Sequence, residues 1–136
     1  MKSMSNQVIH ACTVCIEKCQ NGIDTLQKIS ELCAFRVTAE CAAQLGKSVK
    51  ACDEIIAACN ACIQECQKHM HACENQTCKK YAKECIDECA KTIEFCKKTM
   101  SECHAQKGEC LTDSVRAVKQ LTACAQACQA YKNHKH

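Results

Sequence analysis

The chain has 136 residues, of which 18 are Cys, 3 are Gly and none is Pro or Trp. Its 18 basic and 15 acidic side chains are interspersed and give a formal net charge of +3, and only 3% of the residues are aromatic. Nucleic-acid binding is therefore not expected, because it needs a basic patch or aromatic stacking platforms. No apolar run approaches the roughly 18 residues of a membrane span, so no membrane partner is expected. The length suits a single domain over residues 1–136.

The start of the chain bears on the cellular compartment. Its first ten residues, MKSMSNQVIH, contain no apolar stretch of the signal-peptide type, so we expect a cytoplasmic protein. Cytosolic thiols stay reduced and commonly bind metal. A chain whose signal had been removed would look the same, so a disulfide-stapled, exported helical protein is the alternative.

The secondary structure predicted along the chain is helical. Ala, Lys, Glu, Gln and Leu abound, and no useful stretch alternates with a period of two. Gly22, Gly46, Gly108 and a polar stretch around Asn75 predict helix ends or kinks, with Asn75 or Thr77 as a candidate cap. The expected helices cover 5–20, 23–45, 48–70, 76–106 and 112–131, the first two being alternatively one kinked helix. We predict an all-α fold, an antiparallel four-helix bundle with an extra or kinked helix as its variant.

The cysteines recur at spacings of three, four and seven residues, which place side chains on one face of a helix. Over 76–110 their positions stay within an arc of about 60°, opposite a face rich in Lys and Glu. We therefore predict a core lined by thiols from several helices. The candidate metal ligands are Cys12, Cys15, Cys19, Cys33, Cys41, Cys52, Cys59, Cys62, Cys66, Cys73, Cys78, Cys85, Cys89, Cys96, Cys103, Cys110, Cys124 and Cys128.

Soft thiolates select Cu(I), Zn or iron–sulfur clusters. Structural Zn sites use compact loops, and iron–sulfur ligation usually shows a tight Cys run that often ends in Cys-Pro. Rows of Cys on continuous helices instead suit multiple Cu(I) ions, with about one ion per Cys because Cu(I) accepts few ligands. We predict Cu(I) storage and detoxification, with a Zn or general thiolate metal buffer as the alternative.

Four other residues are candidate ligands. His69, Met70, His71 and His104 carry imidazole or thioether groups that bind Cu(I), although a polar loop between helices is an equal explanation. No catalytic constellation stands out, because a chance Cys–His pairing is expected among so many Cys. We therefore expect no enzyme activity.

Three stretches resemble the copper storage proteins, a family of Cys-rich four-helix bundles. They are ACTVCIEKC at 11–19, CAFRVTAECA at 33–42 and ACNACIQECQKHMHACENQTCKKYAKEC at 58–85. The resemblance implies a bundle whose core thiolates bind many Cu(I) ions, with His and Met near one open end where metal enters. It also implies kinship with the cytosolic members.

The resemblance spans roughly residues 10–100. The link around Gly46 looks shorter than is usual in the family, and 101–136 has no counterpart in its pattern. Expected partners are copper ions and, through them, copper chaperones or copper enzymes. Association into a homo-oligomer through one helix face is a further expectation.

Overall fold

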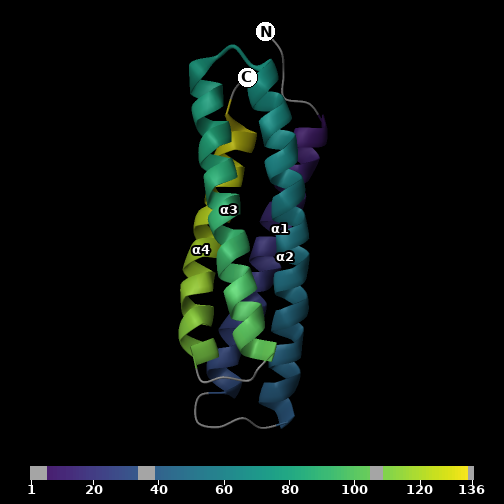
Figure 1. The fold of residues 1–136 in the computed structure, drawn as a ribbon, viewed down its shortest axis with the longest axis vertical. Helices are drawn as coiled ribbons and strands as arrows, with labels where there is room; N and C mark the ends of the chain where they lie inside the picture. Colours follow the sequence, from purple (N-terminus) through teal and green to yellow (C-terminus); the bar gives the residue numbers. More distant parts are fainter. Residues whose placement is uncertain (1–5, 34–38, 105–108, 135–136) are drawn as a thin grey trace.

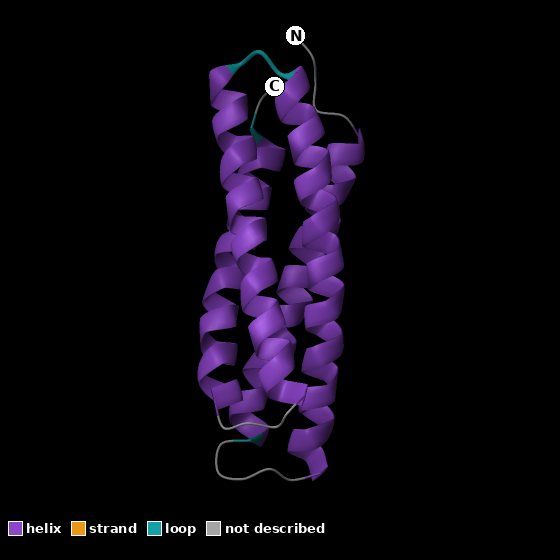
Figure 2. Cartoon of the chain, in the orientation of Figure 1, coloured by secondary structure: helices purple, strands orange, loops and turns teal. Residues whose placement is uncertain are grey.

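The computed structural model describes residues 6–33, 39–104 and 109–134, apart from the side chains of 30, 104 and 109–112. Figures 1 and 2 show the helices of the described residues side by side. They are α1 (Asn6–Leu32), α2 (Ala39–Ala72), α3 (Gln76–His104) and α4 (Glu109–Asn133). The predicted all-α four-helix bundle is confirmed.

Successive helices run in opposite directions, and each packs against two others (Figure 1). Helices α1 and α3 both contact α2 and α4, which encloses one core along the bundle axis. At one end of the bundle α2 passes into α3 through Asn75, and there α1 begins and α4 ends. We call this the Asn75 end. At the opposite end Cys33 is joined to Cys41, and we call this the disulfide end.

The predicted breaks at two glycines are wrong, because α1 continues through Gly22 and α2 continues through Gly46. A glycine inside a helix costs only about 1 kcal/mol relative to Ala, which tertiary packing outweighs. Gly22 also has a packing role, since a Cβ there would collide with Ile55 and lie 3.2 Å from Leu121 Cδ1. The first break instead falls between Leu32 and Ala39, inside the expected helix 23–45.

The break at the Asn75 end agrees with the sequence. The Asn75 side-chain oxygen accepts hydrogen bonds from the backbone N–H groups of Thr77 at 2.9 Å and Cys78 at 3.3 Å. Asn75 thus caps α3, because these N–H groups have no partner within the helix. The cap fixes where α3 begins.

The core has two chemically different parts. Toward the Asn75 end it consists mainly of cysteines, and toward the disulfide end aliphatic side chains take over. The aliphatic part includes the fully buried Leu26, Ile29, Ile55 and Leu121. Since neutral Cys packs as a small apolar residue, both parts bury apolar surface and stabilise the bundle. Within the described ranges, no helix has the length and apolarity to cross a membrane.

Candidate metal centre

Ten cysteine sulfurs form one connected row inside the bundle, which we call the ten-sulfur core. All ten side chains are 0% exposed. All four helices contribute at spacings of three or four residues, which is why one face of each helix suffices. The ten are Cys12, Cys15 and Cys19 of α1, Cys59, Cys62 and Cys66 of α2, Cys85 and Cys89 of α3, and Cys124 and Cys128 of α4.

The row is made of four overlapping quartets, and within each quartet the sulfurs lie within 4.8 Å of one another. From the Asn75 end inward they are Cys12/Cys62/Cys66/Cys85, Cys62/Cys85/Cys89/Cys128, Cys15/Cys89/Cys124/Cys128 and Cys15/Cys19/Cys59/Cys124. Each quartet shares two sulfurs with the next. A thiolate bound in one quartet is therefore placed to bridge to a metal ion in the neighbouring one.

The spacing of the sulfurs matches what one metal ion requires. Neighbouring sulfurs are 3.4 Å apart for Cys85 and Cys128, 3.7 Å for Cys15 and Cys59, and 4.0 Å for Cys89 and Cys128. With a metal–sulfur bond of about 2.3 Å, sulfurs around one ion are about 3.8 Å apart in a tetrahedron and about 4.0 Å apart in a trigonal plane. The spacing of the sulfurs thus fits thiolate metal binding with three or four ligands.

One more thiol pair extends the row toward the disulfide end. Cys52 of α2 and Cys96 of α3 are 0% exposed, and each is the main influence on the pKa of the other. The charges of Cys59 and Cys124 also act on Cys96, so the pair lies next to the innermost quartet. Beyond it the interior is mainly aliphatic. The sulfur row therefore ends inside the bundle and does not run through it.

Contacts among the ten core sulfurs raise the pKa of some thiols and lower the pKa of others, such as Cys62 and Cys124, whereas burial raises the pKa of all ten. Contacts with Cys124, Cys15 and Cys59, followed by burial, raise the pKa of Cys19. Contacts with Cys124 and other neighbouring thiols, followed by burial, raise the pKa of Cys89 as well. No Lys or Arg side chain is buried among the described residues, so no protein cation offsets thiolate charge there. A bound metal ion must supply that positive charge, and its binding must release protons.

A separate group of side chains lies at the Asn75 end. Cys78 is buried and Cys73 is half-buried, and the neighbouring Cys73 adds to burial in raising the pKa of Cys78. His69 Nδ1 lies 3.8 Å from Cys78 Sγ and forms a hydrogen bond with the Tyr131 hydroxyl. These residues place two thiols and one imidazole outside the ten-sulfur core, at the end where α2 passes into α3.

The disulfide end differs from the prediction that every Cys is a ligand. Cys33 and Cys41 are joined in a disulfide, and Cys103 is disulfide-bonded too. A disulfide sulfur offers no thiolate to a metal, so these three are not ligands in this state of the protein. The side chains of Cys110 and His104 lie outside the described part of the structure. The remaining fourteen cysteines form no disulfide.

The other predicted ligands fall at different depths. Met70 is half-buried and packs against the core, whereas His71 is exposed. Tyr131, which sequence reasoning missed, is among the largest fully buried side chains. Its spacing of three from Cys128, and of seven from Cys124, is the signal that would have placed it on the inner face of α4.

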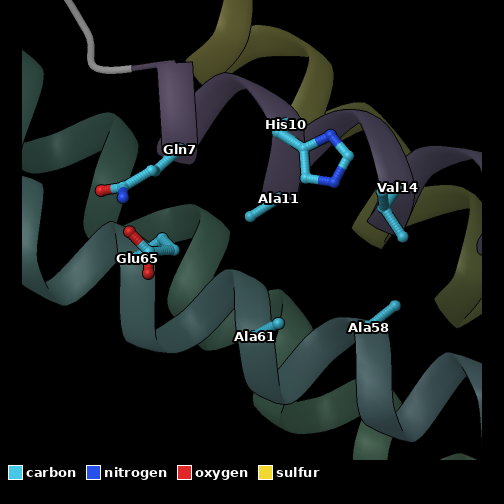
Figure 3. A pocket seen from close by; sticks show the side chains of 7 residues that line it. All are labelled: Gln7, His10, Ala11, Val14, Ala58, Ala61 and Glu65. Atoms are coloured by element: carbon cyan, nitrogen blue, oxygen red, sulfur yellow. The ribbon is translucent and has the colours of Figure 1, made fainter.

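A groove of about 290 Å³ runs along the outside of the bundle between α1 and α2 (Figure 3). Its floor is formed by the methyl groups of Ala11, Ala58 and Ala61, and Gln7, His10, Val14 and Glu65 also line it. No sulfur atom lines this groove. It therefore gives no access to the thiols, although it lies on the two helices that supply six of the ten core sulfurs.

Comparison with known proteins finds no match. No family model, no curated protein and no solved structure matches the chain.

Proposed function

We propose that this protein binds and stores multiple Cu(I) ions through its core thiolates, as a binding protein and not as an enzyme. The observation that carries the proposal is the row of four overlapping sulfur quartets. Bundles of this size need few cysteines for packing, whereas a store needs many equivalent ligands. The resemblance of three stretches to the copper storage proteins points in the same direction.

The charge of the core supports Cu(I) over Zn(II). If each thiol proton is exchanged for one Cu(I) ion, the total charge of the core does not change. A Zn(II) ion held by four thiolates instead leaves two negative charges, and the described core holds no buried Lys or Arg to offset them. Uncompensated charge in a low-dielectric interior is costly. Exchange of one Cu(I) per thiol avoids that cost.

The sharing of sulfurs also supports a soft, low-coordinate ion. A separate tetrahedral site needs four thiolates of its own, so ten sulfurs would complete only two such sites. Cu(I) binds soft thiolates and accepts fewer ligands, so bridging sulfurs allow about one ion per thiolate. The overlapping quartets are thus better suited to a chain of Cu(I) ions than to isolated Zn(II) sites.

An anaerobic Cu(I) titration of the reduced protein against a competing chelator tests the proposal. We expect uptake on the order of ten ions or more, at about one ion per core thiolate. A parallel Zn(II) titration is the control, and we expect it to saturate at a much lower number of ions. Saturation with one or two Cu(I) ions would contradict storage. Recovery of few free thiols from the freshly purified, denatured protein would favour the disulfide-stapled alternative.

A further inference from the structure

Tyr131 lies between two groups of thiols. It belongs to the last turn of α4 and is 0% exposed, unlike the exposed Ala130 beside it. Along α4 it follows Cys128 by three residues, and its hydroxyl contacts His69, which follows Cys66 by three residues along α2 and lies next to Cys78. Cys12, Cys66 and Cys85 belong to the outermost quartet, whereas Cys78 belongs to the group at the Asn75 end. The phenol ring thus separates the ten-sulfur core from that end.

The hydroxyl group of Tyr131 is hydrogen-bonded to His69 Nδ1, the atom through which His69 would bind a metal ion next to Cys78. The rings of Tyr131 and His69 are 5.7 Å apart between centroids. The same nitrogen lies 3.8 Å from Cys78 Sγ. An imidazole nitrogen has either one proton or one lone pair, so Nδ1 cannot serve Tyr131 and a metal ion together.

Along the sides of the described bundle all ten core cysteines are 0% exposed. The groove between α1 and α2 ends on alanine methyl groups and exposes no sulfur. From the disulfide end an ion would have to cross the aliphatic layer that includes Leu26, Ile55 and Leu121. An ion reaching the ten-sulfur core therefore passes the Asn75 end, where the side chain of Tyr131 is in its way.

We propose that Tyr131 is a gate for metal uptake, closed by its hydrogen bond to His69 and opened when a metal ion takes the His69 nitrogen. The inference rests on the proposed function, because it concerns how ions reach the same thiolates. An ion held by Cys78 and His69 frees the phenol to turn aside. The ion then passes to the outermost quartet, where a thiol proton leaves as the thiolate binds, so charge is conserved.

Tyr131→Phe tests the gate, because it keeps the ring and removes only the hydroxyl. Tyr81→Phe is the matched control: Tyr81 is half-buried, stacks on His134 at 4.6 Å, and lies near the same end of the bundle. Stopped-flow mixing with a Cu(I) donor measures the uptake rate. We expect Tyr131→Phe to take up ions about fivefold faster, the factor that corresponds to losing a hydrogen bond worth about 1 kcal/mol. We expect the same final capacity, and no change in Tyr81→Phe.

A second measurement needs no copper. Alkylation of the metal-free protein by N-ethylmaleimide, followed by mass spectrometry, reports how often the core thiols become accessible. We expect about fivefold faster labelling of Cys66 and Cys85 in Tyr131→Phe. His69→Ala should have the same effect, and combining it with Tyr131→Phe should add nothing, because both changes break one hydrogen bond.

These measurements separate the gate from the storage function. If the wild type fails to bind Cu(I), the proposed function fails, whereas the labelling rates still decide whether Tyr131 closes the core. Labelling of Tyr131→Phe at the wild-type rate would overturn the gate. Equal acceleration in Tyr131→Phe and Tyr81→Phe would also overturn it, because the effect would then be a general loosening of that end.

Discussion

Replacing Cys59, Cys62 and Cys66 together by Ala tests whether α2 supplies ligands to the shared row. Cys62 belongs to two quartets, and Cys59 and Cys66 belong to one each, so three of the four quartets lose at least one sulfur. The quartet without an α2 residue stays complete. At about one ion per thiolate, copper capacity should fall by about three ions and not to zero.

Ala is preferred to Ser because it leaves no buried hydroxyl without a partner. Removing three buried sulfur atoms should cost about 1 kcal/mol each, which a domain of ordinary stability survives. Asn60→Ser, Gln64→Ser and Gln67→Ser together form the control on the exposed face of the same helix, with no loss of capacity expected. Bound copper is counted after desalting, and circular dichroism verifies the helices.

Two results of this experiment would refute the reasoning. Unchanged capacity in the Ala variant would mean that the α2 thiols do not bind the ions. Loss of all binding with the helices intact would mean that the quartets do not act as partly independent sites. Either result would require a different assignment of ligands within the bundle.

Gly46→Ala should stabilise the protein by about 0.5 to 1 kcal/mol, because nothing lies within 4 Å of the new methyl group. Gly22→Ala should be about 1 to 3 kcal/mol less stable than Gly46→Ala, since its methyl group would overlap Ile55. In thermal melts each kcal/mol should change the melting temperature by about 3 to 4 °C. Asn75→Ala should cost about 1 kcal/mol through the lost cap, measured by urea unfolding against Asn75→Asp, which should retain the cap. Cys33→Ser with Cys41→Ser should lower stability by about 2 to 3 kcal/mol without reductant and change it little with reductant, because the disulfide closes a loop with a sequence separation of 8 residues. Copper loading at neutral pH should release protons and weaken as pH falls, because thiols such as Cys19 and Cys89, whose pKa values are raised, hold their protons until metal arrives; constant affinity from pH 8 to pH 6 would contradict this.

Periodicity was sufficient to predict the bundle and the inward face of each helix. Spacings of three and four residues placed Cys59, Cys62 and Cys66 on one face of a helix, and the structure confirms that face as buried. The helix ends were harder. Gly22 was expected to end a helix. Instead it leaves room for the side chain of Ile55, which belongs to α2, so the reason for a glycine here lies in another helix and not in the local sequence. The segment between Leu32 and Ala39 contains neither Gly nor Pro, so no local signal indicated a break there.

For the candidate site, too, the sequence predicts what depends on a single helix and not what depends on contacts between helices. The sequence indicated which sulfurs face inward, but the partners within each quartet depend on how four helices are shifted along one another. Cys33 and Cys41 share the thiol pattern of the core cysteines, although they are paired with each other at the disulfide end. Tyr131 contacts His69, which lies 62 residues earlier in the chain, and no spacing rule reaches that far.

The burial of the sulfur row has a consequence for recognition. Along the sides of the bundle the outward positions carry side chains such as Lys18, Glu54, Lys91 and Glu94, and the thiols of the row are 0% exposed. Exchanging inner protons for monovalent ions alters neither these side chains nor the total charge. If the proposed exchange occurs, the loaded and the metal-free protein present the same side surface to a macromolecule that binds there. A partner that distinguishes the two forms would then have to contact the Asn75 end.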